Sequence, residues 1–218
     1  MRPFVVAIDG PAASGKGTLA RRLAARFRFA HLDTGKLYRA TALRVLAVGG
    51  DPGDPDVAVA AARRISPADL DDRALSSEAI ARASSIVSAL PAVRAALLEA
   101  QRDFAARPPA PAKGAVLDGR DIGTVVCPDA AVKLFVTASP EVRAERRVKE
   151  LRERGAAAIY GDVLRDMKER DARDSGRRVA PLAVAPDAVT IDTTGLDADQ
   201  VFEQASEIIA RALAAEGR

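Results

Sequence analysis

The chain has 218 residues, with 33 basic and 30 acidic side chains and a formal net charge of +3. This length suits one domain with a full hydrophobic core, and the single cysteine, Cys127, excludes an internal disulfide and zinc sites built from several cysteines. Aromatic residues make up only 4% of the chain, which argues against a stacking platform for single-stranded nucleic acid.

No apolar run approaches the roughly 20 residues that a membrane span requires. The first strand-like run begins at Phe4, which leaves no room for a signal peptide before it. We therefore expect a cytoplasmic protein without membrane or nucleic-acid partners. Only six of the 33 basic residues are Lys, and Asn and Trp are absent, which indicates a coding bias. The positions of the arginines, and not their number, therefore carry information.

The first predicted strand, Phe4–Ile8, runs into a glycine-rich stretch and then into a helical pattern over Leu19–Phe27. A strand, a glycine-rich turn and a helix start in this order are typical of a phosphate-binding loop, whose backbone N–H groups hold the oxygens of a di- or triphosphate. The alternative is an ordinary turn between a core strand and a core helix. We predict nucleotide binding by Gly10, Pro11, Ala12, Ala13, Ser14, Gly15, Lys16, Gly17 and Thr18.

Within this loop, Lys16 is expected to bridge the β- and γ-phosphates, and the Thr18 hydroxyl to serve phosphate or magnesium. The residue after Lys16 is Gly17, so the hydroxyl comes one position later than in GTPase switches. This ending is more typical of small-molecule and nucleotide kinases.

The rest of the chain alternates short apolar runs with helical patterns. Further strands are predicted at Ala30–Leu32, Val116–Leu117, Val132–Val136 and Val189–Ile191. Helices are predicted at Lys36–Val48, Ser77–Phe104, Glu141–Arg154, Val163–Arg173 and Asp199–Ala214, with a break or kink at Pro91. This alternation predicts an α/β protein of three layers, with a five-stranded parallel sheet covered on both faces.

Two stretches interrupt the alternation. Residues 49–76 are rich in Asp, Pro and Gly, lack strand-like alternation and are predicted to form a small surface insertion. Residues 152–181 are dense in charge and, taken alone, indicate a solvated helical face with ion pairs one turn apart. Beside a phosphate loop, an arginine-rich hairpin is also a candidate lid over the transferring phosphate.

Polar residues follow the predicted second and third strands, where ligands bind in open parallel sheets. Thr34 is expected either to cap the next helix or to serve the site, and Arg39 to reach an acceptor phosphate. After the third strand, Asp118 stands where a carboxylate orients magnesium-bound water, and Arg120 and Asp121 are expected to project into the cleft. The alternative for this Asp-Gly-Arg-Asp stretch is a hydrogen-bonded turn.

Several motifs in order over nearly the whole chain resemble those of bacterial cytidylate kinases, a family of P-loop nucleoside monophosphate kinases. They are Gly-Pro-Ala-Ala-Ser-Gly-Lys-Gly-Thr at 10–18, Leu-Asp-Thr-Gly at 32–35 with Tyr38-Arg39, the stretch 83–94, Asp-Gly-Arg-Asp-Ile-Gly-Thr-Val-Val at 118–126, Glu-Arg-Asp-Ala-Arg-Asp at 169–174, and Val-Ala-Pro-Leu at 179–182. The Asp-Gly-Arg-Asp and late Arg-Asp motifs discriminate far better than the phosphate loop alone.

The resemblance implies that the loop 10–18 holds ATP and that the acceptor is CMP or dCMP. It places Ser85, Arg94 and Asp121 against the cytosine ring and Asp174 against the ribose. Thr34 stands where the family usually has Ser, which keeps the hydroxyl on the substrate side. The arginines that it gathers around the phosphates are Arg39, Arg120, Arg170 and Arg177.

For catalysis, the resemblance implies that γ-phosphoryl transfer from ATP is stabilised by Mg²⁺ and by Lys16, Arg120, Arg170 and Arg177. Thr18 and Asp118 are the expected metal residues, directly or through water. The expected enzyme is a single kinase domain over 1–218, with a short NMP-binding insertion at about 49–76 and an arginine-rich lid at about 152–181. It would act in pyrimidine nucleotide metabolism, and we expect a monomer because no long apolar face is left over.

Two other functions stay open at this point. One is another kinase of the same fold, with UMP, AMP or a metabolite alcohol as acceptor. The other is a nucleotide-binding switch that acts on RNA or a ribosome. The Gly17 position disfavours the switch, as does the lack of an Asn-Lys-x-Asp guanine-reading motif in a chain without Asn.

Overall fold

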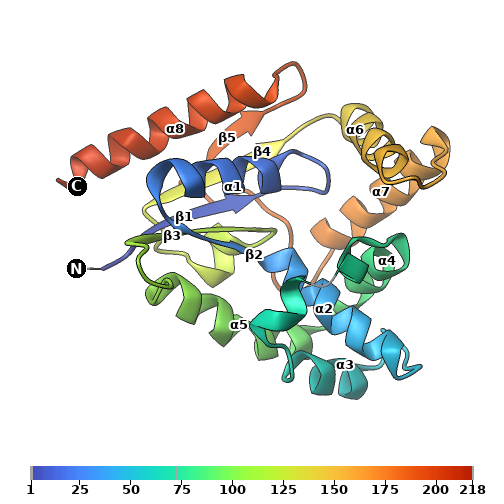
Figure 1. Cartoon of the computed structure of the whole chain (residues 1–218). Helices are drawn as coiled ribbons and strands as arrows, with labels where there is room; N and C mark the ends of the chain where they lie inside the picture. The colour runs from blue at the N-terminus through green and yellow to red at the C-terminus, as the bar shows by residue number, and fades with distance from the viewer. Residues whose placement is uncertain (1, 72, 218) are drawn as a thin grey trace. The chain divides into compact units, whose positions relative to one another are not determined.

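The structure is a computed structural model that describes residues 2–71 and 73–217. The chain divides into two compact units. The first comprises the chain up to Leu32 together with the part from Ala105 onward, and the second comprises Asp33–Phe104. The first unit contains the sheet and the glycine-rich loop, whereas the second is helical (Figure 1).

A five-stranded sheet with the order β2-β3-β1-β4-β5 forms the centre of the first unit. The pairs β1–β3, β1–β4 and β4–β5 run parallel. All five predicted strands are present, so the α/β fold with a five-stranded parallel sheet is confirmed. Their bounds are β1 (Phe4–Asp9), β2 (Ala30–Asp33), β3 (Gly114–Gly119), β4 (Val132–Thr137) and β5 (Val189–Asp192).

Two helices cover one face of this sheet. They are α1 (Lys16–Phe27) and α8 (Ala198–Ala215), which lie together on the same side in Figure 1. Leu23 of α1 and Ile209 of α8 are completely buried, in one cluster with Ile8 of β1. Because β1 is the middle strand, its apolar run is covered as the continuous pattern predicts.

A pair of mutually packed helices follows β4. They are α6 (Pro140–Glu153) and α7 (Tyr160–Ser175). Ser139 caps α6, since its Oγ accepts from the Val142 N–H at 3.3 Å. Both helices were expected from the sequence and are confirmed, with α7 beginning three residues earlier than predicted.

The second unit has its own hydrophobic core, in which α2 packs against α3 and α4. As predicted, the long pattern breaks before Pro91, and the two helices on either side of the break bend by 99°. The helical elements of this unit are α2 (Thr34–Ala47), α3 (Pro55–Ala62), the short 3₁₀ turns η1 (Pro67–Asp71) and η2 (Arg73–Ser76), α4 (Glu78–Val87) and α5 (Pro91–Ala106).

The first part of residues 49–76, where the sequence pattern predicts no helix, is helical in the structure. This part forms α3, and Ala58 and Ala62 of α3 are buried in the core of the second unit. Asp54 starts the helix by accepting from two backbone N–H groups, and Pro55 occupies the first turn, where its missing N–H costs nothing. The capping Asp54 and the following Pro55 mark this helix start in the sequence, but the helix spans only eight residues.

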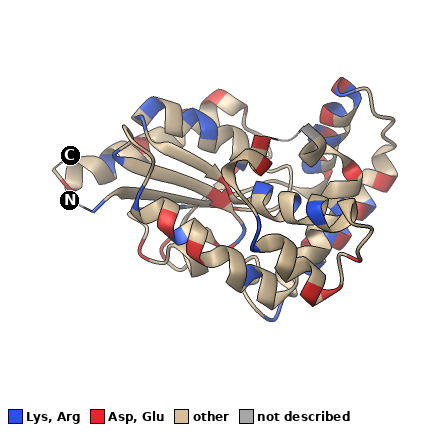
Figure 2. Cartoon of the chain, turned by 60° about the horizontal axis from the view of Figure 1, so that its bottom comes forward, with Lys and Arg blue, Asp and Glu red and all other residues tan. Residues whose placement is uncertain are grey.

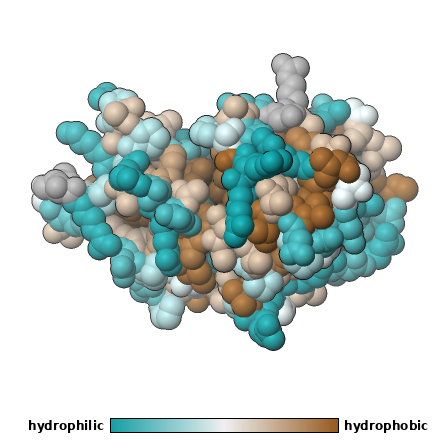
Figure 3. All heavy atoms as spheres, turned by 90° about the horizontal axis from the view of Figure 1, so that it is seen from below, coloured by the Kyte–Doolittle hydropathy of each residue, from teal (hydrophilic) through white to brown (hydrophobic). Residues whose placement is uncertain are grey.

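Within the described residues, no single helix is long and apolar enough to cross a membrane, and only the bent pair α4–α5 reaches that length and apolarity jointly. Hydrophobic residues show between hydrophilic ones on the face in Figure 3. The large hydrophobic side chains that stay exposed are scattered along the chain, at Leu46, Val48, Ile86, Ile159, Tyr160, Val179, Val184 and Val189.

Gly10→Ala tests the close approach of the loop to β4. Gly10 has φ +153°, and a Cβ there would lie 2.0 Å from the carbonyl oxygen of Val136. We expect this substitution to lower the free energy of unfolding by about 3 kcal/mol or more, because backbone must move. The measurement is urea unfolding. Gly155→Ala is the control: with φ +77° and no atom within 4 Å, it should cost only about 1 kcal/mol. Equal losses of unfolding free energy in the two variants would show that the contact with Val136 is not the cause.

Candidate functional site

The backbone between β1 and α1 is curled by three residues with positive φ: Gly10 (153°), Ala13 (57°) and Gly15 (90°). Helix α1 begins at Lys16, and Gly15 at its N-cap has no side chain to cap the first N–H groups. These groups carry the partial positive charge of the helix N-terminus. The loop therefore has the backbone of an anion-binding site.

Carbonyl groups of the loop are held by side chains. The Pro11 carbonyl accepts from Lys16 Nζ at 3.2 Å, and Thr193 Oγ1 lies 3.2 Å from the Ser14 carbonyl oxygen. In a trans peptide the carbonyl and the N–H of the next residue point in opposite directions, so these contacts also orient the N–H groups that follow Pro11 and Ser14. The Ser14 hydroxyl is itself completely buried and has no hydrogen bond among the described residues. A buried hydroxyl of this kind in such a loop fits a phosphate oxygen as its missing partner.

Asp118 is a buried carboxylate beside this loop. Its Oδ1 lies 2.8 Å from His31 Nε2, and because a carboxylate only accepts, the imidazole donates. Its Oδ2 faces the loop, since a Cβ on Gly17 would lie 3.6 Å from it. The Thr18 hydroxyl accepts from Arg21 at 3.2 Å. Mg²⁺ is usually held by one or two protein oxygens plus substrate phosphates, and this donor set fits that pattern.

Asp9, at the end of β1, fixes the turn that carries Asp121. Its two carboxylate oxygens accept from the backbone N–H groups of Ile122 (2.8 Å) and Gly123 (2.7 Å), the first residues of the π-helical turn η3 (Ile122–Val126). Burial raises the pKa of Asp9 to about 6, and the two N–H groups offset that effect only in part. Asp121 itself is buried at the N-cap of η3.

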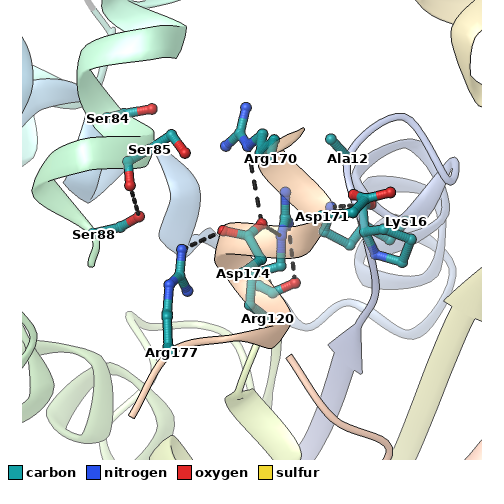
Figure 4. Close-up of polar contacts among 12 residues, drawn as sticks. Ala12, Lys16, Ser84, Ser85, Ser88, Arg120, Arg170, Asp171, Asp174 and Arg177 are labelled. Carbon is teal, nitrogen blue, oxygen red and sulfur yellow. Dashed lines mark hydrogen bonds and ion pairs between the residues drawn. The ribbon is translucent and has the colours of Figure 1, made fainter. Parts of the chain in front are cut away.

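Three arginines converge on Asp174 of α7 (Figure 4). Arg120 Nε donates to Oδ2 at 2.9 Å, Arg177 Nη2 donates to Oδ1, and Arg170 Nε lies 3.9 Å from Oδ2. Burial on its own raises the pKa of Asp174, whose exposure is 1%, but the guanidinium charges of Arg120, Arg177 and Arg170 outweigh it and hold the pKa below its usual value.

Three guanidinium groups thus surround the Asp174 carboxylate in this cluster. Elsewhere, acidic and basic residues are interspersed over the helices (Figure 2). A cluster of three arginines suits phosphate oxygens, which arginine binds through paired N–H groups.

In the second unit, Thr34 is the first residue of α2, and Asp33 is the N-cap. The alternative that Thr34 caps the helix is therefore wrong by one position, although its side chain is buried. Arg39, one turn further, donates to the Leu75 carbonyl at 2.8 Å. This hydrogen bond links α2 to η2 and orients the Arg39 side chain.

Ser85 and Arg94 are both buried, although a polar residue on a helix can equally face solvent. Ser85 is 1% exposed on α4, and its carbonyl accepts from Ser88 Oγ at 3.2 Å. Arg94 is 8% exposed on α5, donates to the Ser88 carbonyl at 3.2 Å and lies 5.3 Å from the ring centre of Tyr38. Two polar side chains buried in one helical unit fit a specific recognition role.

The predicted residues thus fall into two groups. In the first unit, Arg120 comes together with Arg170, Asp174 and Arg177, although it lies 54 positions before Asp174. Thr34, Arg39, Ser85 and Arg94 belong to the second unit. Sequence reasoning missed Asp9, although an acid at the end of a strand and next to a glycine-rich loop is a recognisable signal. It also missed Thr193, which lies outside any motif and is identified only by its contacts.

Known cytidylate kinases match this chain over almost its whole length. The family model described as cytidylate kinase matches residues 6–211. The chain is 63% identical over 207 residues to a cytidylate kinase of Rhodospirillum rubrum, covering 95% of this chain and 97% of the relative. It is 61% identical over 205 residues to a cytidylate kinase of Paramagnetospirillum magneticum, covering 94% and 97%.

Among solved structures, two distant neighbours share the fold. An uncharacterized protein from Eubacterium ventriosum has a TM-score of 0.52 at 13% identity, covering 95% of this chain and 98% of its own. TT1252 from Thermus thermophilus has a TM-score of 0.50 at 20% identity, covering 98% and 99%. At such low identity these likenesses extend to the fold alone.

The raised pKa of Asp9 predicts a specific dependence of stability on pH. Between about pH 4 and pH 6 the folded chain keeps the Asp9 proton while the unfolded chain, with a pKa of 3.8, has lost it. The contribution of Asp9 to stability therefore falls as pH rises through this window, by on the order of 3 kcal/mol, and stays low above it.

The measurement is urea unfolding of the wild type and Asp9→Asn from pH 3.5 to pH 8. Asn cannot ionise and satisfies only one of the two N–H groups, so it should be the less stable protein at low pH. That deficit should shrink between pH 4 and 6. Parallel stability curves across this window would show that Asp9 does not titrate there.

Proposed function

Since the chain belongs to the cytidylate kinase family, we propose that it transfers the γ-phosphoryl group of ATP to CMP and dCMP, giving ADP with CDP or dCDP. The observation that carries this proposal within the first unit is the combination of the loop 10–18 with the arginine cluster on Asp174. A kinase needs both a phosphate cradle and positive charge around the migrating group.

The phosphate loop is the proposed ATP site, bound through backbone N–H groups and the first turn of α1. Lys16 would leave the Pro11 carbonyl to bridge the β- and γ-phosphates. Mg²⁺, when bound, neutralises phosphate charge, and Thr18 and Asp118 would hold it directly or through water. His31 donates to Oδ1 of Asp118, and Oδ2 of the same carboxylate faces the loop.

For the acceptor, we propose that Arg120, Arg170 and Arg177 exchange their carboxylate partner in part for phosphate oxygens. Asp174 would then accept from the ribose hydroxyls while it still balances the arginine charges. The CMP phosphate oxygen attacks the γ-phosphoryl in line, and no covalent intermediate with the enzyme is required. Arg39 would add a further positive charge toward the acceptor phosphate.

Base selection is proposed to rest on Asp121, Arg94 and Ser85. Cytosine offers an amino donor at N4 and acceptors at N3 and O2, which suit a carboxylate and a guanidinium respectively. Uracil reverses the pattern at N3 and position 4 and would leave buried polar groups unpaired. Such a mismatch can discriminate by up to about 10⁴-fold.

The wider description of the protein is part of the same proposal. One kinase domain over 1–218 would use residues 49–76 on the acceptor side and residues 152–181 as its lid. A cytoplasmic monomer remains our prediction. Another kinase of this fold, with UMP, AMP or a metabolite alcohol as acceptor, is the nearest alternative, and an RNA-linked nucleotide switch is more distant.

The test of the proposal is ADP release from MgATP with CMP, dCMP, UMP, AMP and GMP offered separately. We expect a strong signal with CMP, a similar one with dCMP and a far lower one with UMP. Lys16→Ala should reduce turnover by about 10³-fold or more with an unchanged unfolding midpoint. Lys149→Ala, which removes an exposed lysine of α6, is the control and should keep full activity. If the protein binds ATP but releases no ADP with any of the five monophosphates, the proposal is wrong.

Asp121→Asn tests base reading separately from phosphoryl transfer. An amide presents either its oxygen or its NH₂ group to the base, so the preference for cytosine over uracil should drop. We expect the ratio of kcat/KM for CMP to that for UMP to fall about 10- to 100-fold, with little change in KM for ATP. Asp129→Asn, at an exposed ion pair with Arg2, is the matched control. Equal losses for CMP and UMP would remove Asp121 from base recognition.

A further inference from the structure

The guanidinium of Arg143 on α6 joins three segments of the first unit. The residue is only 3% exposed. Its Nε donates to the Ala138 carbonyl at 3.0 Å, and its Nη1 donates to the Ala12 carbonyl at 3.2 Å. Its two terminal nitrogens also pair with Asp171, Nη1 with Oδ1 at 3.2 Å and Nη2 with Oδ2 at 2.5 Å. A planar group held by four acceptors has one orientation.

At the loop, this contact sets the plane of one peptide. The Ala12 carbonyl points toward Arg143, so the N–H of Ala13 in the same trans peptide points away from it. Ala13 has φ 57°, a left-handed conformation that alanine adopts reluctantly. The hydrogen bond from Arg143 therefore supports a strained peptide of the phosphate cradle from its outer side.

At the other end, the contact sets the position of α7. Asp171 follows Arg170 directly and precedes Asp174 by three residues on the same helix (Figure 4). A helix moves as a rigid element over such a short distance. Fixing the Asp171 carboxylate therefore fixes the arginine cluster that gathers on Asp174.

We infer that Arg143 is a positioning residue that couples the Ala12–Ala13 peptide of the phosphate loop to α7. In this role it holds the donor phosphates and the arginine cluster at one spacing. The inference rests on the proposed function for its catalytic consequence, because in-line transfer loses rate steeply when the reacting groups are misplaced. The coupling between the loop and α7 does not depend on which substrate the protein binds.

A second ion pair joins the same two helices and separates this role from plain stabilisation. Lys168 of α7 lies 3.5 Å from Glu141 of α6, and both side chains are more than half exposed. This pair links α6 with α7 but does not involve the loop carbonyls. Lys168→Met is therefore the matched control for the loss of an α6–α7 link.

The experiment compares Arg143→Lys, Arg143→Met, Asp171→Asn and Lys168→Met with the wild type. Arg143→Lys keeps the charge and the burial but lacks the planar fork, so it is the decisive variant if Arg143→Met fails to fold. We measure kcat, KM for ATP and for CMP, the unfolding midpoint, and hydrogen exchange of the amides of residues 10–18 and of α7 without nucleotide.

We expect Arg143→Lys to lose about 10- to 100-fold in kcat, with KM for ATP and CMP within about threefold of the wild type. Exchange should become faster in both the loop and α7. Asp171→Asn should loosen α7 and lower kcat. In the double variant Arg143→Lys/Asp171→Asn, the loss of kcat, expressed as a free energy, should be smaller than the sum of the losses in the two single variants. Lys168→Met should leave kcat and loop exchange unchanged.

Two outcomes would overturn the inference. One is a folded Arg143→Lys with kcat within twofold of the wild type. The other is faster exchange in α7 alone, with the loop unaffected, because Arg143 would then only join two helices. If the wild type itself fails to phosphorylate CMP, the proposed function fails, whereas joint loosening of the loop and α7 still decides whether Arg143 couples them.

Discussion

The parallel pairing of β1 with β3 is the constraint on which the candidate site depends. It sets Asp9 opposite Gly119 and Ile8 opposite Asp118, so the loop after β1 and the Asp-Gly-Arg-Asp turn leave the sheet at the same edge. Asp9 then ties the two turns together through the N–H groups of Ile122 and Gly123. Without this register, neither Asp118 nor Asp121 would have a defined place relative to the phosphate loop.

Buried charge is the second feature that organises the first unit. Asp174 and Arg143 are both almost fully buried. The charge of Asp174 is compensated by arginines, and that of Arg143 by a carboxylate and two backbone carbonyls. Both networks include α7, which contributes Asp174 and Arg170 to one and Asp171 to the other. The charged face of this helix is therefore largely committed to partners, with Asp171 paired to Arg143 and Asp174 to the three clustered arginines.

The second unit shows where local pattern and tertiary environment diverge. Its helices α2, α4 and α5 follow the predicted periodicity, but α3 was missed because it has only eight residues and lies in a stretch rich in Asp, Pro and Gly. Ser85 and Arg94 lie on helices whose pattern alone permits a solvent-facing position. Their burial comes from the packing of the helices in this unit, with Arg94 beside the Tyr38 ring, and no spacing rule reveals it.

The amino-acid sequence by itself determined the strands, most helix positions, the phosphate loop and the family, because these depend on short-range periodicity and on residues adjacent in the chain. Only the tertiary structure decided which distant groups meet: Arg120 with Asp174, His31 with Asp118, and Arg143 with both Ala12 and Asp171. Such contacts join residues separated by 28 to 131 positions. Their formation depends on strand order and helix packing, which result from burial over the whole core and leave no local mark in the sequence.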